Sequence, residues 1–299
     1  MASHGADYLR ALYQDWTDRM GANPDMTVTD LRALFGEWES ATLEAVDVSY
    51  KSGQMGGVSG VWAYPAGGDR NKVLLYTHGG GFVVGSSSTH RKLAGHVAKA
   101  LGVTAFVLDY RLAPEHPFPA QVDDAVAVFN GLVASGIAAK NITTIGDSAG
   151  GNLAVATVLR LRQLESETPG AVIAFSPWVD MEMTGGSLES KAALDVLVQR
   201  PILEGMRGMF LGETTPTDHP IASPLLSEYQ DYPPLYLNAG SDETLLDDAI
   251  RLHEKARSAG VNSTLSVVEG MQHVFPFLAG RAPEADEEIK RIADWYSGL

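Results

Sequence analysis

The sequence predicts an α/β fold with a mostly parallel, eight-stranded sheet covered by helices on both faces. The main observation is an alternation of apolar, strand-length runs with helix-length amphipathic patterns, which continues from Lys72 almost to the end of the chain. The chain has 299 residues without a break in composition, so we expect one domain. Its hydrophobic fraction of 45% is ordinary for a globular protein with a full core.

The predicted elements follow in chain order from these patterns. The strands are expected at Ala45–Lys51, Val58–Pro65, Lys72–Thr77, Val103–Asp109, Ile142–Gly146, Ala171–Phe175, Leu235–Asn238 and Thr264–Val268. The first two strands flank a Gly-rich turn at Ser52–Gly57, which favours an antiparallel pair at the sheet edge. The helices are expected at Thr89–Leu101, Ala120–Ser135, Asn152–Leu164, Leu245–Gly260 and Ala282–Ser297.

Two segments depart from this alternation. Residues 1 to about 42 contain one or two amphipathic helices, and residues from about 180 to 223 are rich in Met and Gly before a turn-forming stretch. Open α/β sheets bind ligands at the carboxyl ends of their strands, so we interpret both segments as a helical cap over that edge. The alternative is peripheral packing without a role in binding.

The composition excludes several classes of function. A formal net charge of −15 opposes binding to nucleic acids or anionic membranes, and the absence of cysteine excludes disulfides and thiolate chemistry. The first twenty residues lack the apolar core of a secretion signal, and no apolar run reaches membrane-spanning length. We therefore expect a cytoplasmic protein without a membrane span. The paired acidic residues are typical of solvated helix starts, so no metal site is expected.

The segment Gly146-Asp147-Ser148-Ala149-Gly150 joins a predicted strand to a predicted helix. A serine on such a sharp turn needs small neighbours, because a Cβ has no room there. The turn exposes the hydroxyl and leaves backbone N–H groups beside it, where an oxyanion can be stabilised. Alone, this pattern also fits an ordinary tight turn.

A second glycine-rich loop, His78-Gly79-Gly80-Gly81-Phe82, directly follows the strand that ends at Thr77. Consecutive glycines let the backbone N–H groups approach an anion closely. A dinucleotide-binding turn is the competing interpretation, but its third glycine would be required at Val84, and no suitable acidic residue follows. We therefore interpret this loop as a source of oxyanion donors.

A serine nucleophile needs a histidine base oriented by a carboxylate. His273 is the best placed of the eight histidines, because it follows the last predicted strand. Asp242 is the first acidic residue after the strand that ends at Asn238, whereas Glu243 and two later acids compete with it. The order Ser148, Asp242, His273, with each residue after a separate strand, is that of α/β-hydrolases.

Together with Tyr110-Arg111-Leu112-Ala113-Pro114-Glu115, these motifs resemble the hormone-sensitive lipase family, the bacterial family IV esterases. The resemblance implies an α/β-hydrolase fold without a cofactor, with Ser148, His273 and Asp242 as the catalytic triad. It implies further that the N–H groups of Gly80, Gly81 and Ala149 form the oxyanion hole. It also allows a homodimer through the last strand and helix. The sequence after Asp242 departs from the family's frequent Asp-Pro-Leu, so the shape of that loop is open.

We therefore hypothesise a carboxylic-ester hydrolase that acts on short or medium acyl esters, with lactones as a further substrate class. The alternatives are an amidase or deacetylase using the same site, and a small-molecule receptor with an inactive site. The candidate substrate-binding residues are Phe82, Trp178, Met206, Met209 and Val274, although ordinary cap packing explains the methionines equally well.

Overall fold

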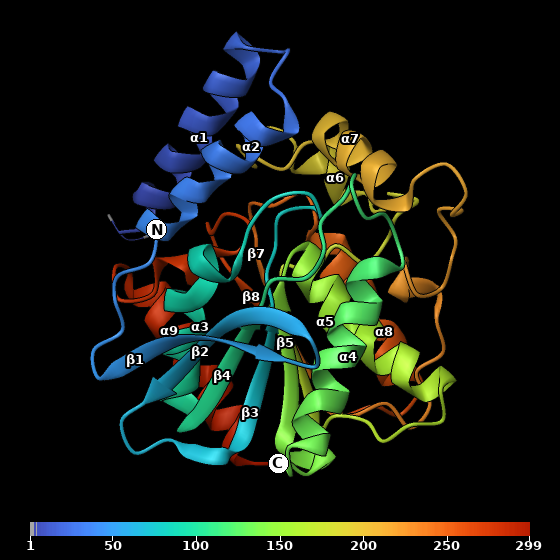
Figure 1. Cartoon of the computed structure of the whole chain (residues 1–299). Helices are drawn as coiled ribbons and strands as arrows, with labels where there is room; N and C mark the ends of the chain where they lie inside the picture. Colours follow the sequence, from blue (N-terminus) through green and yellow to red (C-terminus); the bar gives the residue numbers. More distant parts are fainter. Residues whose placement is uncertain (1–2, 4) are drawn as a thin grey trace.

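The computed structural model describes residue 3 and residues 5–299, and within them it contains one eight-stranded sheet (Figure 1). Met1, Ala2 and His4, at the start of the predicted cap, lie outside the described residues. The strand order is β1-β2-β4-β3-β5-β6-β7-β8. The strands are β1 Val48–Met55, β2 Val58–Pro65, β3 Asp69–Thr77, β4 Val103–Leu108, β5 Ile142–Asp147, β6 Ala171–Phe175, β7 Leu235–Gly240 and β8 Ser263–Val268.

The predicted fold class is confirmed. Strand β2 is antiparallel to both β1 and β4, and the other strands pair in parallel. The prediction for β1 was three residues too early, and the turn after it is shorter than expected. Gly56 and Gly57 both have positive φ, 58° and 83°, so they form the tight turn by themselves, and Met55 pairs with Val58.

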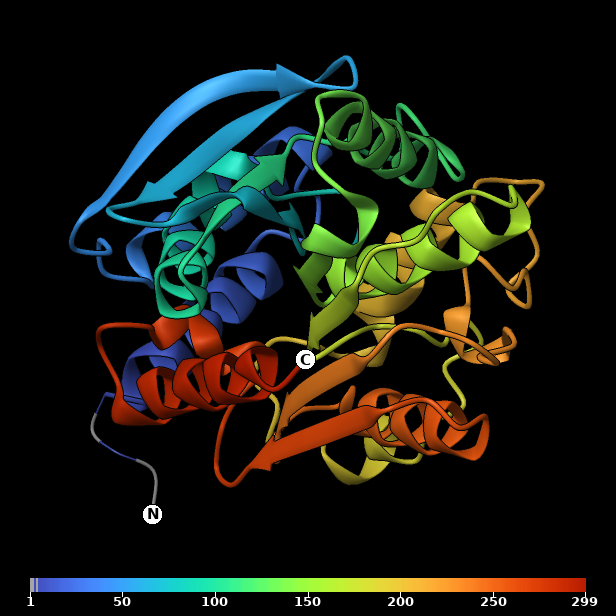
Figure 2. The same ribbon diagram turned by 90° about the horizontal axis from the view of Figure 1, so that it is seen from below.

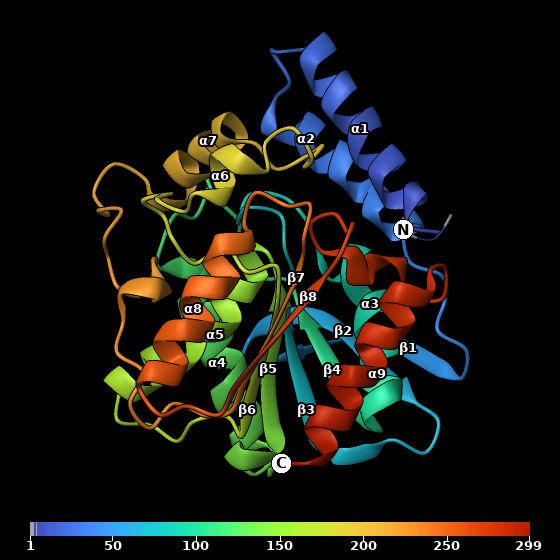
Figure 3. The ribbon, with the colours of Figure 1, turned by 180° about the vertical axis from the view of Figure 1, so that it is seen from behind.

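Helices cover both faces of the sheet. Figures 2 and 3 show α3 and α9 on one face and α4, α5 and α8 on the other. Strands β4 to β7 are buried along their whole length, which is consistent with their largely apolar sequences. The helices of the sheet layers are α3 Ser87–Leu101, α4 Ala120–Ala134, α5 Ala149–Gln163, α8 Leu246–Ser258 and α9 Pro283–Ser297.

Two separate segments lie over the carboxyl ends of the parallel strands (Figures 1 and 3). The first contains α1 Asp7–Ala22, α2 Val28–Phe35 and the 3₁₀ helix η1 Gly36–Ser40. The second contains α6 Ser187–Ser190 and α7 Arg200–Leu211. We refer to the two together, residues 5–42 and 180–223, as the cap. None of the described helices combines the length and the apolar character that crossing a membrane requires.

Candidate active site

Ser148 lies on the sharp turn between β5 and α5. Its φ of 54° and ψ of −121° are strained for a residue with a side chain. Its N–H donates to the carbonyl of Phe175 on the next strand at 2.8 Å, which holds the turn in place. A Cβ at Gly146 or Gly150 would collide with backbone or side-chain oxygens, so both positions require glycine. The helix α5 begins at Ala149, three residues earlier than predicted. The N–H of Ala149 is therefore one of the first N–H groups of the helix, which have no acceptor within the helix itself.

The glycine loop after β3 lies beside Ser148. Gly80 and Gly81 have φ values of 109° and 60°, which only glycine adopts without strain. Both glycines line the same cavity as Ser148. A side chain at Gly81 would collide with the sulfur of Met206, so the cap residue Met206 covers the loop directly.

The segment after β4 supports the glycine loop. The hydroxyl of Tyr110 donates to the carbonyl of His78 at 2.6 Å, and the two rings stack with their centroids 4.1 Å apart. The N–H of Ala113 donates to the carbonyl of Phe82 at 2.9 Å. Burial and the neighbouring His90 lower the pKa of His78 to about 3, so its ring is neutral and orients the loop.

The carboxylate beside His273 in the structure belongs to Glu243, whereas Asp242 was the expected acid. The distance between Nδ1 of His273 and Oε1 of Glu243 is 3.6 Å. Asp242 is half-buried and its Oδ1 instead accepts a hydrogen bond from Ser241 at 3.0 Å. In the turn after β7 the side chain of Asp242 is thus bound to Ser241, whereas that of Glu243 faces the histidine.

Two groups fix the orientation of Glu243. Its Oε2 accepts hydrogen bonds from the hydroxyl of Ser176 at 2.7 Å and from the N–H of Gly240 at 2.9 Å. The Ser176 hydroxyl oxygen also accepts from the N–H of Val274 at 3.0 Å. Ser176 therefore links the loop that carries the acid to the loop that carries His273.

Several charges act on the imidazole of His273, which is only 3% exposed. Burial disfavours the charged ring, but the nearby carboxylates of Glu243, Asp195 and Asp147 outweigh this effect and raise the pKa of His273 above its ordinary value. The site therefore favours the imidazolium that forms when a histidine takes a proton from a serine.

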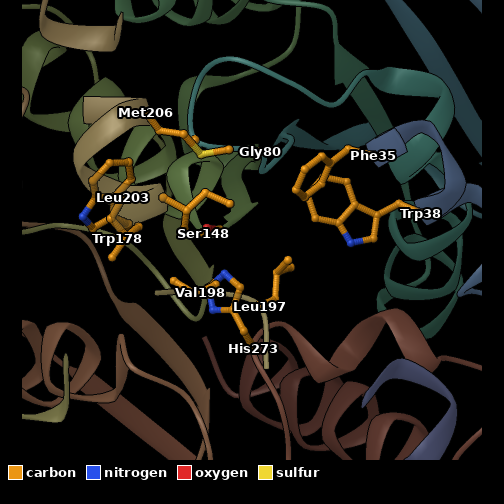
Figure 4. Close-up of a pocket in the computed structure, with 12 residues that line it drawn as sticks. Phe35, Trp38, Gly80, Ser148, Trp178, Leu197, Val198, Leu203, Met206 and His273 are labelled. Carbon is orange, nitrogen blue, oxygen red and sulfur yellow. The ribbon is translucent and has the colours of Figure 1, made fainter. Parts of the chain in front are cut away.

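A small cavity joins these groups (Figure 4). Its volume, counted as the space open to the centres of water molecules, is about 40 Å³. In the figure Ser148 lies between Met206 and Gly80 on one side and His273 on the other. The lining residues are Phe35, Trp38, Gly80, Gly81, Ser148, Trp178, Leu197, Val198, Ile202, Leu203, Met206 and His273.

Of the predicted substrate-binding residues, Trp178 and Met206 line this cavity, whereas three others do not. Phe82 is buried against Phe210, with their stacked rings 3.7 Å apart. Met209 lines a separate groove between α7 and the turn that joins α1 to α2. Val274 is buried behind the histidine, where its backbone binds Ser176.

The cap contributes residues that the sequence did not single out. Phe35 and Trp38 form an aromatic cluster with Trp16, with ring centroids 4.9 to 5.4 Å apart, and both line the cavity. The helical spacing of these aromatic residues within residues 5–42 is the sequence signal that could have identified them. Leu197 and Val198 come from an irregular segment that carries no such periodicity. Within the described part of the chain, no three His, Asp or Glu side chains form a group that could hold a metal ion.

Comparisons with known proteins agree with this geometry. A family described as having the alpha/beta hydrolase fold matches residues 74–277. The chain is 37% identical to an acetyl-hydrolase of Streptomyces hygroscopicus over 293 residues, which cover 97% of this chain and 95% of the relative. It is 35% identical to an esterase of Acinetobacter venetianus over 229 residues, which cover 76% of this chain and 75% of the relative. The protein is thus an α/β-hydrolase.

A solved structure narrows the assignment within this fold. The crystal structure of an esterase from the bacterial hormone-sensitive lipase family superposes with a TM-score of 0.94, at 37% identity, and covers 100% of this chain and 99% of the other. The chain therefore belongs to the hormone-sensitive lipase family of α/β-hydrolases. It is an enzyme of the esterase class.

Proposed function

We propose that the enzyme hydrolyses carboxylic esters with short acyl groups through a covalent intermediate on Ser148. The observation that carries this proposal is the convergence of Ser148, His273 and the loop of Gly80 and Gly81 on one small cavity. His273 takes the proton of the Ser148 hydroxyl, and the oxygen attacks the ester carbonyl. Glu243 stabilises the resulting imidazolium.

In the next step the N–H groups of Gly80, Gly81 and Ala149 stabilise the negative oxygen of the tetrahedral intermediate. The imidazolium then gives its proton to the departing alcohol, and the acyl group remains on Ser148. Water attacks this ester with His273 as the base, releases the acid and restores the serine. Apart from the substrate and the attacking water, the groups named in these steps all belong to the chain.

The size of the cavity supports short acyl groups. A volume of about 40 Å³ is small for a binding site, and it favours a short acyl group such as acetyl or butyryl over a long chain. The similarity to an acetyl-hydrolase supports the same substrate range.

A Ser148→Ala variant tests the proposal, with Ser258→Ala as the matched control. Ser258 is an exposed serine on α8 whose hydroxyl donates to the carbonyl of Glu254. Loss of the nucleophile should lower the kcat for p-nitrophenyl acetate or butyrate by about 10⁴-fold or more, whereas the control should retain full activity. Retained activity in purified Ser148→Ala would refute the assignment.

A substrate panel separates the ester proposal from the other chemistries that this site allows. It should contain p-nitrophenyl esters from acetate to decanoate, ε-lactones and N-acetyl amides. The proposal requires the fastest turnover on short esters, and ring opening without release of an alcohol would instead identify a lactonase. Stoichiometric labelling of Ser148 by an organophosphate would exclude an inactive receptor.

A further inference from the structure

The irregular cap segment Leu194–Val198 lies between the two loops that carry Glu243 and His273, and hydrogen bonds tie it to both. On the acid side, the N–H of Thr244 donates to Asp195 Oδ2 at 2.9 Å, and its hydroxyl donates to the carbonyl of Val198 at 2.7 Å. Thr244 directly follows Glu243, so these bonds fix the backbone of the acid.

The same segment is bound to the loop of His273. The side chain of Gln272 donates from Nε2 to the carbonyl of Leu194 at 3.0 Å and accepts from the N–H of Val196 at 3.1 Å. Helix α1 holds the segment from the other side, because the hydroxyl of Thr17 donates to the carbonyl of Val196 at 2.6 Å. The cap and both catalytic loops therefore meet in this segment.

Asp195 is the centre of this arrangement. Its Oδ1 accepts from the N–H groups of Leu197 and Val198, at 3.0 and 2.8 Å, and these two residues form part of the cavity wall. Its Oδ2 accepts from the N–H of Thr244 at 2.9 Å, and the Thr244 hydroxyl, which donates to Val198, lies 3.2 Å from the same oxygen. A carboxylate can accept all three N–H bonds, whereas an amide in its place would turn an NH₂ group toward at least one of these donors.

The charge of Asp195 also calls for an explanation. The side chain is 2% exposed and forms no ion pair with a Lys or Arg of the described chain, although burying an unpaired carboxylate is costly. The titratable groups around the site are Glu243, Asp147, Tyr13 and His273. Of these, His273 is the group that can become positive. In the active enzyme, where the ring starts neutral, the imidazolium forms when His273 takes the proton of Ser148.

We propose that Asp195 is a positioning residue that couples the docked cap to the catalytic loops. It holds the cavity wall at Leu197 and Val198 and the backbone beside Glu243 in one arrangement, and its negative charge favours the protonated form of His273 in the transition state. The proposal rests on the ester-hydrolase function given above. It assigns the segment a role in catalysis as well as in covering the substrate.

The test compares Asp195→Asn with Asp180→Asn. Asp180 is a matched control because it is an equally buried carboxylate of the cap that accepts backbone N–H groups, but it pairs with Arg251 instead of the catalytic loops. The rates of p-nitrophenyl butyrate hydrolysis are measured between pH 4.5 and 9, together with the melting temperature Tm.

We expect Asp195→Asn to lower kcat by roughly ten- to a hundred-fold, because small displacements of catalytic groups have effects of this order. The acidic limb of the pH profile should shift to lower pH, since His273 loses a stabilising charge. Asp195→Glu should keep the limb near its original position. Asp180→Asn should lower Tm but keep the limb and a kcat within about three-fold of the wild type.

An unchanged limb with nearly full kcat in Asp195→Asn would overturn the proposal, and so would equal losses in Asp195→Asn and Asp180→Asn. If Asp195→Asn does not fold, Thr244→Val replaces it, because this variant removes the hydroxyl bonds to the segment but keeps the charge. It should lower kcat without moving the limb, and wild-type kcat would refute the coupling. A wild-type enzyme that hydrolyses no ester and is not labelled at Ser148 would instead refute the proposed function.

Discussion

The choice between Glu243 and Asp242 as the catalytic acid can be decided by two neutral substitutions. Glu243→Gln removes the charge that lies 3.6 Å from Nδ1 of His273. At this distance, and at an effective dielectric constant of about 20, the attraction between a carboxylate and an imidazolium is roughly 4–5 kcal/mol. Since about 1.4 kcal/mol corresponds to a factor of ten in rate, kcat should fall by roughly 10³-fold.

Geometry adds to this electrostatic loss. In the Glu243→Gln variant the amide oxygen would remain with its donors Ser176 and Gly240, so the NH₂ group would face the Nδ1–H of the histidine. The ring would then lose the acceptor that selects its tautomer.

Asp242→Asn changes a half-buried side chain that binds Ser241, so it should keep kcat within about three-fold. Both variants are assayed by steady-state hydrolysis of p-nitrophenyl butyrate, with circular dichroism to confirm folding. A loss of about a hundred-fold or more in Asp242→Asn, with Glu243→Gln nearly unaffected, would refute our assignment of the acid.

Three further predictions concern the pH profile, the cavity and the stability of the enzyme. The pKa of His273 lies above the ordinary 6.5, so the midpoint of the acidic limb of the kcat/KM profile should lie above pH 6.5. A midpoint below pH 6.5 would contradict the conclusion that the nearby carboxylates outweigh the effect of burial on the ring. Met206 lines both the cavity of about 40 Å³ and a neighbouring groove of about 200 Å³, so Met206→Ala should connect the two spaces. The ratio of the hydrolysis rates of the octanoate and butyrate esters should then rise. An unchanged ratio would show that Met206 does not limit the length of the acyl chain. Burial and the nearby Asp180 raise the pKa of Asp248 from 3.8 to about 8, so the folded state keeps a proton that the unfolded state releases, and stability falls as pH rises through this range. Asp248→Asn should therefore raise Tm more at pH 9 than at pH 5, and equal changes at both pH values would contradict this reasoning.

The sheet could be predicted from the sequence because each strand is marked by the apolar pattern of its own residues. The central strands are buried on both faces, so they appear as short, largely apolar runs bounded by turns. The predicted boundaries of these strands agree with the structure to within a few residues. The strained turn at Ser148 is similarly visible, because its glycines are required by contacts within the motif and with the neighbouring strand. The prediction of β1 was less accurate, since an edge strand with alternating burial has a weaker apolar signal.

The cavity wall was less predictable, because it is formed by contacts between distant segments. Trp38 and Leu197 meet at one cavity although they are far apart in sequence, and neither belongs to a motif. Phe82 and Met209 were expected there from their position near the motifs. Phe82 is instead covered by Phe210, and Met209 faces a neighbouring groove. Such outcomes depend on how cap side chains pack, which sequence periodicity does not determine.

The carboxylate beside His273 could be predicted only in part from the sequence. The position of β7 in the sequence indicates that a carboxylate follows at the carboxyl edge of the sheet. Two adjacent acids, Asp242 and Glu243, lie at this point of the chain, so the sequence alone does not distinguish them. The choice depends on the close approach of the two catalytic loops: a Cβ at Gly240 would collide with the carbonyl oxygens of Met271 and Gln272. The N–H of Asp242 then donates to the carbonyl of Met271 at 3.0 Å, which fixes the direction of the loop. With the backbone held in this way, Glu243 projects inward to His273, so the acid follows from the contact between the loops and not from its order after the strand.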